Sequence, residues 1–145
     1  MAGVLDGDLG RGIARVVMAL HSRLFRATGG KVGGRLPGVP VLLLTTTGRH
    51  SGKKRVTPLS YLARGDDLVL VASSGGSDRM PAWYLNLRAN PTVWVQVGKQ
   101  KRQMCARPAT GEERAQLWPK VVELYRGYES YQLKTERRIP LVILS

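Results

Sequence analysis

The chain has 145 residues, enough for one domain with a buried core and too few for two independent cores. Hydrophobic residues make up 43% and charged residues 23%, which excludes a chain that is disordered throughout. A net charge of +13, from 23 Lys and Arg against 10 Asp and Glu, predicts an anionic partner: nucleic acid, acidic lipid, or a phosphorylated or polycarboxylated small molecule. One cysteine and two histidines exclude an intrachain disulfide and predict no metal site. Cys105 itself is expected to be a small core residue.

Residues 1–38 are predicted to form an amphipathic helix followed by a glycine-rich connector. Apolar residues recur at helical spacing from Leu9 to Leu24, and arginines occupy other positions of this segment. Such a helix can lie on an anionic membrane surface or cover one side of the core, and the sequence leaves both open. Because the arginines interrupt the apolar positions, we expect no membrane span, no secretory signal and a cytoplasmic protein.

Residues 39–145 are predicted to form a second unit of short strands joined by turns. Strands are expected at 41–47, 55–62, 68–72, 92–97, 101–107 and 139–144. Pro58 should bend its strand or place it at an edge of the sheet. Because hairpins join successive strands, we expect an α+β fold whose antiparallel sheet closes into a small barrel.

Helices are expected between and after these strands. One is predicted at 80–89, and another opens at a capping box made by Thr110 and Glu113. Pro119 should kink or restart this second helix, which continues to Tyr125. A last short helix is expected at 128–135.

The strongest functional signal is the turn Gly48–Arg55, which is rich in cations. Its backbone N–H groups can form an anion nest, and arginine can bind phosphate or carboxylate with two hydrogen bonds. His50 is expected to assist. The turn does not match a Walker A loop, because its glycine spacing is one residue short and Lys54 stands where Ser or Thr would bind magnesium. A solvated basic hairpin is the alternative interpretation.

Two further signals are a loop of small residues at 72–76 and a short helix at 81–87. The small residues would let a planar or phosphorylated ligand approach the backbone closely, although ordinary loops have the same composition. Trp83 and Tyr84 on the short helix could form one wall of a planar cofactor site, or could belong to the core.

Tyr125, Tyr128 and Tyr131 form the last signal. Their spacing of three residues places them on roughly one face of a helix. Phenol groups donate protons and stack on planar ligands, so these residues are candidates for catalysis, with a structural tyrosine stripe as the alternative.

Together these motifs resemble the actinobacterial family of deazaflavin-dependent nitroreductases. The matching residues are 43–52, 55–59, 82–87 with Asn90 and Pro91, and a closing stretch from Glu112 to Pro140, so that the resemblance covers about 39–144. It implies a split β-barrel, similar to FMN-binding barrels, with flanking helices. It also implies the coenzyme F-420, an 8-hydroxy-5-deazaflavin with a phosphodiester and a polyglutamate tail. Members of the family pass a hydride from the reduced coenzyme to quinones, and some reduce nitroaromatic compounds.

The resemblance also implies which residues form the site. The residues expected to bind the cofactor are Arg49, His50, Ser51, Lys53, Arg55, Val56, Thr57, Pro58, Ala72, Ser73, Ser74, Ala82, Trp83, Tyr84, Asn86 and Tyr128. Among these, the cations of the turn would hold phosphate or tail carboxylates, and Tyr128 would close over the ring. The residues expected to act in catalysis are Tyr125, Tyr128, Tyr131 and Ser73. Those expected to line the acceptor pocket are Ser60, Trp83 and Tyr131.

Two positions depart from the family pattern. Ser60 stands where nitro-reducing relatives carry tyrosine, and Ser74 stands where a lysine is common. The first difference favours a quinone over a nitroaromatic acceptor. Three alternatives are a split-barrel oxidoreductase that uses FMN, a basic barrel that binds single-stranded nucleic acid, and a purely structural protein of the membrane surface. We expect no nucleic acid, because the few aromatic residues cluster on the predicted helices. The sequence leaves the oligomeric state open.

Overall fold

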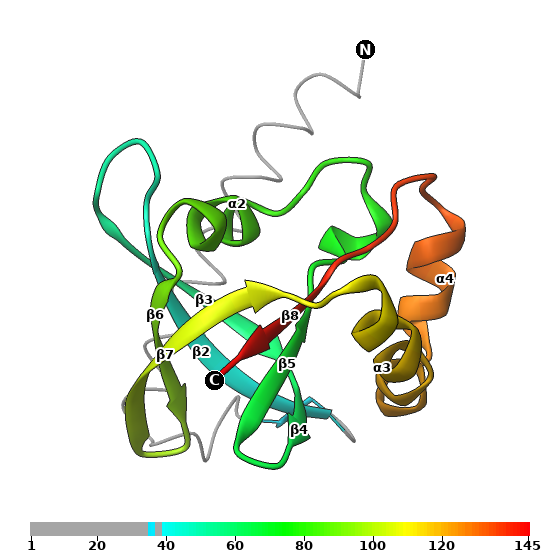
Figure 1. Cartoon of the computed structure of the whole chain (residues 1–145), viewed down its shortest axis with the longest axis horizontal. Helices are drawn as coiled ribbons and strands as arrows, with labels where there is room; N and C mark the ends of the chain where they lie inside the picture. The colour runs from blue at the N-terminus through cyan, green and yellow to red at the C-terminus, as the bar shows by residue number, and fades with distance from the viewer. Residues whose placement is uncertain (1–34, 37–38) are drawn as a thin grey trace.

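The computed structural model describes residues 35–36 and 39–145 (Figure 1). The strands are β1 (Arg35–Leu36), β2 (Val39–Thr47), β3 (Lys54–Ser60), β4 (Leu62–Arg64), β5 (Asp67–Val71), β6 (Thr92–Val97), β7 (Gln100–Pro108) and β8 (Leu141–Leu144). The helices are the short 3-10 turn η1 (Ser74–Gly76), α2 (Ala82–Ala89), α3 (Gly111–Leu124) and α4 (Gly127–Leu133). The helix expected at 9–27 and most of the glycine-rich connector lie outside the described residues.

The strands form an antiparallel barrel that closes through one bent strand. Every strand pairing within the described residues is antiparallel, in the order β3–β2–β6–β7–β8–β5–β4, and β1 also pairs with β2. The first and last strands of this path, β3 and β4, are separated in the chain by Tyr61 alone. The two ends of the sheet are therefore successive parts of one bent strand (Figure 1). The predicted α+β barrel with flanking helices is confirmed.

Alternation along the strands divides the apolar residues between two clusters. In β2, Leu42 and Leu44 point into the barrel, where they meet residues of α2, β6 and β8. The second cluster lies where α3 and α4 cover the other side of β5 and β8, around Val69 and Ile143. Because β5 and β8 contribute to both clusters, their residues are buried on both faces. None of the helices in the described ranges is long and apolar enough to span a membrane.

The structure confirms the edge position predicted for Pro58 and excludes a restart of the helix at Pro119. Within the described residues β3 pairs only with β2, so Pro58 occupies the edge position that its missing N–H favours. Pro119 lies inside α3, which runs from Gly111 to Leu124 and does not restart there. Strand β2 begins at Val39, two residues before the start of the strand predicted at 41–47, and it includes Pro40.

The prediction for Cys105 was wrong. Its side chain is exposed on β7, where Cys105 pairs with Thr92 of β6. Its neighbours Met104 and Ala106 are the residues of β7 that point into the core. The alternation of the strand therefore places Cys105 on the outer face.

The start of α3 predicts a specific response to acid. Thr110 Oγ1 accepts from the backbone N–H of Glu113, and Glu113 accepts from the backbone of Thr110 and from both terminal nitrogens of Arg107, at 2.7 and 2.9 Å. The hydrogen bonds from Arg107 are the main reason that the pKa of Glu113 is lowered to about 2. A lowered pKa stabilises the fold above the unfolded value of about 4.5, and this contribution is lost as the pH falls toward 2.

We therefore expect the wild-type protein to melt at a higher temperature than Glu113→Gln near neutral pH. The difference between the two melting temperatures should shrink as the pH falls from about 4.5 to about 2. Thermal unfolding followed by circular dichroism at several pH values measures this difference. A difference that stays constant across the window would show that the Glu113 carboxylate contributes nothing through its charge.

Candidate functional site

The turn between β2 and β3 is closed by its own backbone. The N–H of Gly48 donates to the carbonyl of Lys53 at 2.7 Å, and the N–H of Gly52 donates to the carbonyl of Gly48 at 2.8 Å. Gly52 has a φ of +70°, a conformation that glycine adopts without strain. These contacts hold the cations of the turn close together on one loop.

Helix α2 fixes the turn through one buried amide. Asn86 Oδ1 accepts from the backbone N–H of Arg49 at 3.1 Å and from Arg49 Nη1 at 2.9 Å. Asn86 is only 5% exposed, and its Nδ2 lies 3.5 Å from Thr46 Oγ1. The turn, β3 and α2 together line a cavity of about 710 Å³ that is open to solvent, which we call the cationic cavity.

A second cavity of about 700 Å³ lies between β3, η1, Trp83 and the tyrosines that follow α3; we call it the aromatic cavity. Tyr128 is buried at its wall, whereas Tyr125 at the rim is 40% exposed. The ring centroid of Tyr125 lies 5.1 Å from that of Tyr128 and 6.1 Å from that of Tyr131. The three rings therefore form one aromatic wall.

Hydroxyl groups in this wall are paired. Ser60 Oγ and the hydroxyl oxygen of Tyr128 are 2.5 Å apart, and the hydroxyl oxygens of Tyr125 and Tyr131 are 3.2 Å apart. Burial is the main cause of a raised pKa for Tyr128, while the hydrogen bond to Ser60 works in the opposite direction. The pKa of Tyr131 is raised mainly by its hydrogen bond to Tyr125. Both phenols are therefore protonated near neutral pH and can donate hydrogen bonds.

The two cavities are adjoining parts of one groove along β3. Thr57 lines both of them, and the start of α2 follows the same division, with the preceding residue Pro81 in the aromatic cavity and Ala82 in the cationic one. The edge position of β3 leaves this side of the strand open. A ligand with an anionic end and a planar end can therefore span the groove.

Arg137 orders the loop that follows β5. Its Nε donates to the carbonyl of Ser77 at 2.8 Å, and its terminal nitrogens donate to the carbonyls of Ala72 at 3.2 Å and Ser73 at 2.9 Å. A single guanidinium thus donates to several loop carbonyls to which no strand partner donates. Gln132 of α4 holds the same segment, because its Nε2 donates to the carbonyl of Arg137 at 2.8 Å. The loop and α4 are consequently fixed to each other.

Gly76 is the point where this loop meets α4. Its φ is +84°, and a Cβ at this position would lie 2.8 Å from the backbone oxygen of Tyr131. Gly75 also has a positive φ, of +64°, but a Cβ there would have no atom within 4 Å. A side chain at Gly75 would therefore cause backbone strain alone, whereas a side chain at Gly76 would cause both backbone strain and a steric clash.

We expect Gly76→Ala to lower the free energy of unfolding by about 3 kcal/mol and Gly75→Ala by only about 1 kcal/mol, because the second variant carries the strain alone. Gly76→Ala should also weaken ligand binding in the aromatic cavity, since the added methyl pushes Tyr131 outward. Urea unfolding of both variants measures the difference. Equal losses of stability would show that the loop does not press against α4.

Most of the site residues predicted from the sequence lie on the groove. The cationic cavity is lined by Arg49, His50, Ser51, Arg55, Val56, Thr57, Ala82 and Asn86. The aromatic cavity is lined by Thr57, Pro58, Ser60, Ser73, Ser74, Trp83, Tyr125, Tyr128 and Tyr131. Lys53, Ala72 and Tyr84 line neither cavity: Lys53 is exposed on the turn, and the other two side chains belong to the barrel core.

Two details of the site differ from the prediction. The tyrosines do not share one helical face, because α3 ends before Tyr125 whereas Tyr128 and Tyr131 belong to α4. Lys54 lines the cationic cavity although it was not selected as a binding residue. The sequence motif contained Lys54, but the predicted strand began one residue too late to include it on β3, where it lies two residues before Val56.

Comparison with known proteins agrees with this geometry. The family model described as "F420H(2)-dependent quinone reductase" matches residues 17–145. The chain belongs to this family. An F420H(2)-dependent quinone reductase of Mycobacterium tuberculosis is 40% identical over 146 residues, which cover 95% of this chain and 98% of the relative. The resemblance noted in the sequence is thereby confirmed, and the F420H(2)-dependent quinone reductases are oxidoreductases that use reduced coenzyme F-420.

Solved structures support the same assignment. The chain is similar to an F420-H2 dependent reductase, with 46% identity and a TM-score of 0.68 over 73% of this chain and 94% of that one. The haem storage protein HutZ from Vibrio cholerae has a TM-score of 0.55 but only 17% identity, over 72% of this chain and 80% of that one. This second likeness shows the fold alone.

Proposed function

We propose that this protein transfers a hydride from reduced coenzyme F-420 to a quinone-type acceptor in the groove along β3. The observation that carries the proposal is the division of this groove into a cationic end and an aromatic end that share Thr57. A deazaflavin with a phosphodiester and carboxylates has the same division. The proposal assigns the anionic part to the turn and the ring to the tyrosine wall.

The residues of the cationic cavity fit the anionic part of the coenzyme. Arg49 uses one terminal nitrogen on Asn86, which leaves further N–H donors for a phosphate or carboxylate. Arg55 and His50 line the same cavity and are exposed. The Asn86 amide therefore orients Arg49 before a ligand binds, and this lowers the entropy that binding costs.

The residues of the aromatic cavity fit a planar ring and its acceptor. When bound, the deazaflavin supplies two electrons as a hydride. The protein must then position the acceptor and stabilise the negative charge that grows on its oxygen. Tyr128 has a protonated hydroxyl, which Ser60 holds at 2.5 Å inside the cavity. We assign Tyr128 as the hydrogen-bond donor to the acceptor, with Tyr125, Tyr131 and Ser73 on the surrounding walls.

Quinones are the acceptor class that we favour, and nitroaromatic compounds are the second class. Ser60 gives the aromatic cavity a small wall where nitro-reducing relatives carry a tyrosine. With Tyr128 donating its O–H to the acceptor, the Ser60 O–H donates to the Tyr128 oxygen, so Ser60 adds no separate donor for a nitro group. The relative rates with a quinone and a nitroaromatic acceptor test this ranking.

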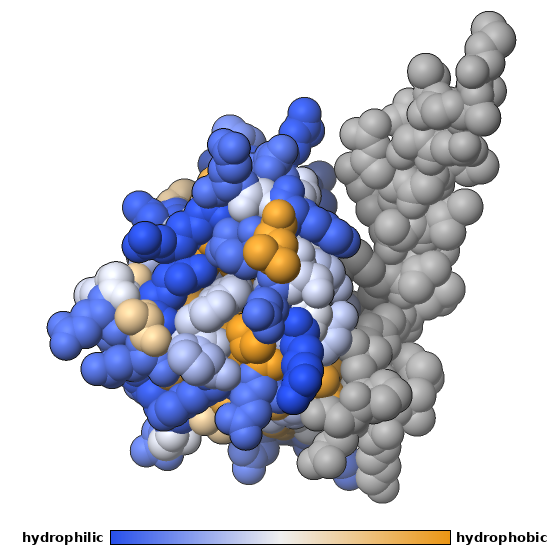
Figure 2. Space-filling view, turned by 90° about the vertical axis from the view of Figure 1, so that its right-hand side faces the viewer, coloured by the Kyte–Doolittle hydropathy of each residue, from blue (hydrophilic) through white to orange (hydrophobic). Residues whose placement is uncertain are grey.

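We also propose a peripheral contact with an anionic membrane, where lipid-soluble quinones reside. Figure 2 shows the face with α3 and α4, a largely hydrophilic surface with isolated apolar residues. Leu133 at the end of α4 is 84% exposed, and Arg126 and Lys134 flank this helix. An exposed leucine between cations supports binding to anionic lipid. Co-sedimentation with anionic but not with zwitterionic vesicles would support this contact.

Turnover tests the proposed function directly. Purified protein is mixed with the reduced coenzyme and menadione, and the return of visible absorbance of the oxidised deazaflavin is followed. We expect protein-dependent oxidation of the coenzyme. No binding of the coenzyme at micromolar concentration would overturn the proposal. A flavin spectrum of the purified protein would favour FMN instead, and steeply salt-dependent oligonucleotide binding without coenzyme competition would favour a nucleic acid.

A further inference from the structure

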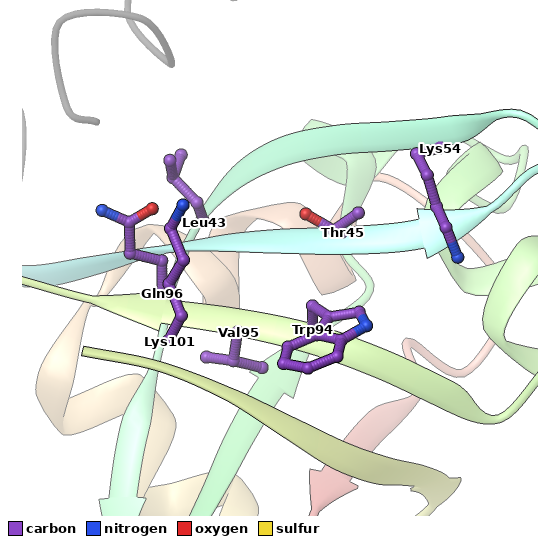
Figure 3. Close-up of a pocket in the computed structure, with 7 residues that line it drawn as sticks. All are labelled: Leu43, Thr45, Lys54, Trp94, Val95, Gln96 and Lys101. Carbon is purple, nitrogen blue, oxygen red and sulfur yellow. The ribbon is translucent and has the colours of Figure 1, made fainter. Parts of the chain in front are cut away.

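The outer face of β2 and β6 carries an exposed tryptophan between two lysines (Figure 3). Trp94 is 46% exposed, and Lys54 and Lys101 lie on either side of it along the sheet. These side chains line a small open cavity of about 270 Å³. We call Lys54, Trp94 and Lys101 the outer strip.

Strand register explains why these residues meet. Trp94 pairs with Thr45 of β2, and Lys101 of β7 pairs with Gln96, which lies two residues after Trp94 on β6. Residues two apart on a strand point to the same face. Val93, between the outward residues Thr92 and Trp94, is fully buried in the core.

The outer strip is continuous with the cationic cavity. Lys54 lines both the cationic cavity and the cavity around Trp94. Its Nζ donates to Thr47 Oγ1 at 3.0 Å, which holds the ammonium group over the last residue of β2. A ligand that leaves the cationic cavity past Lys54 therefore reaches Trp94 next and then Lys101.

The positive charge of the outer strip has no acidic partner within the described part of the chain. The ion pairs found there involve Arg64 and Arg107, and neither lysine of the strip forms one. An exposed indole next to solvated ammonium groups can stack on the flat peptide planes of a ligand whose carboxylates meet the lysines.

We propose that the outer strip binds the polyglutamate tail of the coenzyme after the tail leaves the cationic cavity. A chain of linked glutamates has the required chemistry, because each residue adds one carboxylate and one planar amide. From Thr47 to Thr45, which pairs with Trp94, the outer face of β2 extends about 7 Å, a length that two or three extended residues cover. The inference rests on the proposed function, since it assigns a further part of the same coenzyme.

The test compares two forms of the oxidised coenzyme, one with a tail of several glutamates and one without glutamate. Dissociation constants are measured by deazaflavin fluorescence for the wild type, Lys101→Glu, Trp94→Ala and Lys120→Glu. Lys120 is an exposed residue of α3, so its replacement makes the same charge change on a different face. Since Lys101 is exposed at the end of a hairpin, Lys101→Glu leaves the fold intact.

We expect Lys101→Glu to weaken binding of the tailed coenzyme roughly tenfold, because it replaces an attraction by a repulsion. Trp94→Ala should weaken it roughly threefold. The affinity for the form without glutamate should change less than about twofold in both variants. Lys120→Glu should leave both affinities near the wild-type values, and added salt should reduce the preference of the wild type for the tailed form.

The outcomes separate the outer strip from the proposed function. If Lys101→Glu and Trp94→Ala change both forms equally, or change neither, the strip does not bind the tail while the proposed function stands. If the wild type binds the form without glutamate as tightly as the tailed form, the tail contacts no part of the protein. If the wild type binds neither form, the proposed function is wrong and the inference falls with it.

Discussion

Replacing Arg49 and Arg55 together by alanine is expected to weaken binding of coenzyme F-420 about a hundredfold. Both side chains line the cationic cavity, and a hydrogen bond to a charged group contributes about 1.5–3 kcal/mol. Loss of about 3 kcal/mol over the two positions corresponds to this factor. Equilibrium titration of each variant with the oxidised coenzyme, followed by deazaflavin fluorescence, measures the effect.

A matched control separates direct contact from total charge. Lys120→Ala combined with Arg126→Ala also removes two positive charges, but from the α3 and α4 side of the molecule. We expect this control to change the affinity by less than threefold at physiological salt, because the charges are screened over the intervening distance. If the control weakens binding as much as the arginine variant, the turn acts only through net charge.

Arg49→Lys refines the same experiment. Lysine keeps the charge but lacks the forked geometry that lets Arg49 donate to Asn86 and to a ligand at once. We expect an affinity between those of the wild type and the Arg49→Ala variant. Wild-type affinity would indicate that the contact with Asn86 does not orient the cation.

Tyr128→Phe is expected to lower kcat about a hundredfold and to leave the dissociation constant of the coenzyme unchanged. Phenylalanine keeps the ring in the aromatic wall, so only the hydroxyl is lost. Removing one preorganised donor to a developing oxyanion costs typically a factor of 100 to 1000. Steady-state kinetics with menadione, together with a coenzyme titration, separates the two parameters.

Two neighbouring variants serve as controls for Tyr128. Tyr125→Phe removes a hydroxyl at the exposed rim of the same wall and should lower kcat by less than fivefold. Ser60→Ala removes the partner that holds the Tyr128 hydroxyl and should have an intermediate effect. Wild-type kcat in Tyr128→Phe would show that this hydroxyl does not act on the acceptor.

Much of the fold could be predicted because it depends on local patterns. The alternation in β6 and the capping box at Thr110 are both encoded within a few residues, and the structure shows them as predicted. The exposed position of Cys105 depends on the alternation of β7 relative to the core, which Met104 and Ala106 define. This local signal outweighs the general tendency of cysteine to be buried, on which the prediction rested.

The candidate site could be predicted in its composition but not in its assembly. The cationic turn and the tyrosines were identifiable as motifs, whereas the contact between Arg49 and Asn86 joins residues 37 positions apart. Arg137 likewise orders the carbonyls of a loop that lies 60 to 64 positions earlier in the chain. Contacts of this kind depend on tertiary packing, which short motifs do not encode. The break between α3 and α4, which places Tyr125 outside the helix that carries Tyr128 and Tyr131, was likewise not predictable from the short motif.

A crystal structure of the protein soaked with oxidised coenzyme F-420 tests the central claim most directly. The account predicts that the phosphodiester contacts Arg49 and the turn around Ser51, and that the deazaflavin ring lies in the aromatic cavity beside Tyr128. A ring found outside this cavity, or a phosphodiester that makes no contact with the turn, would contradict it.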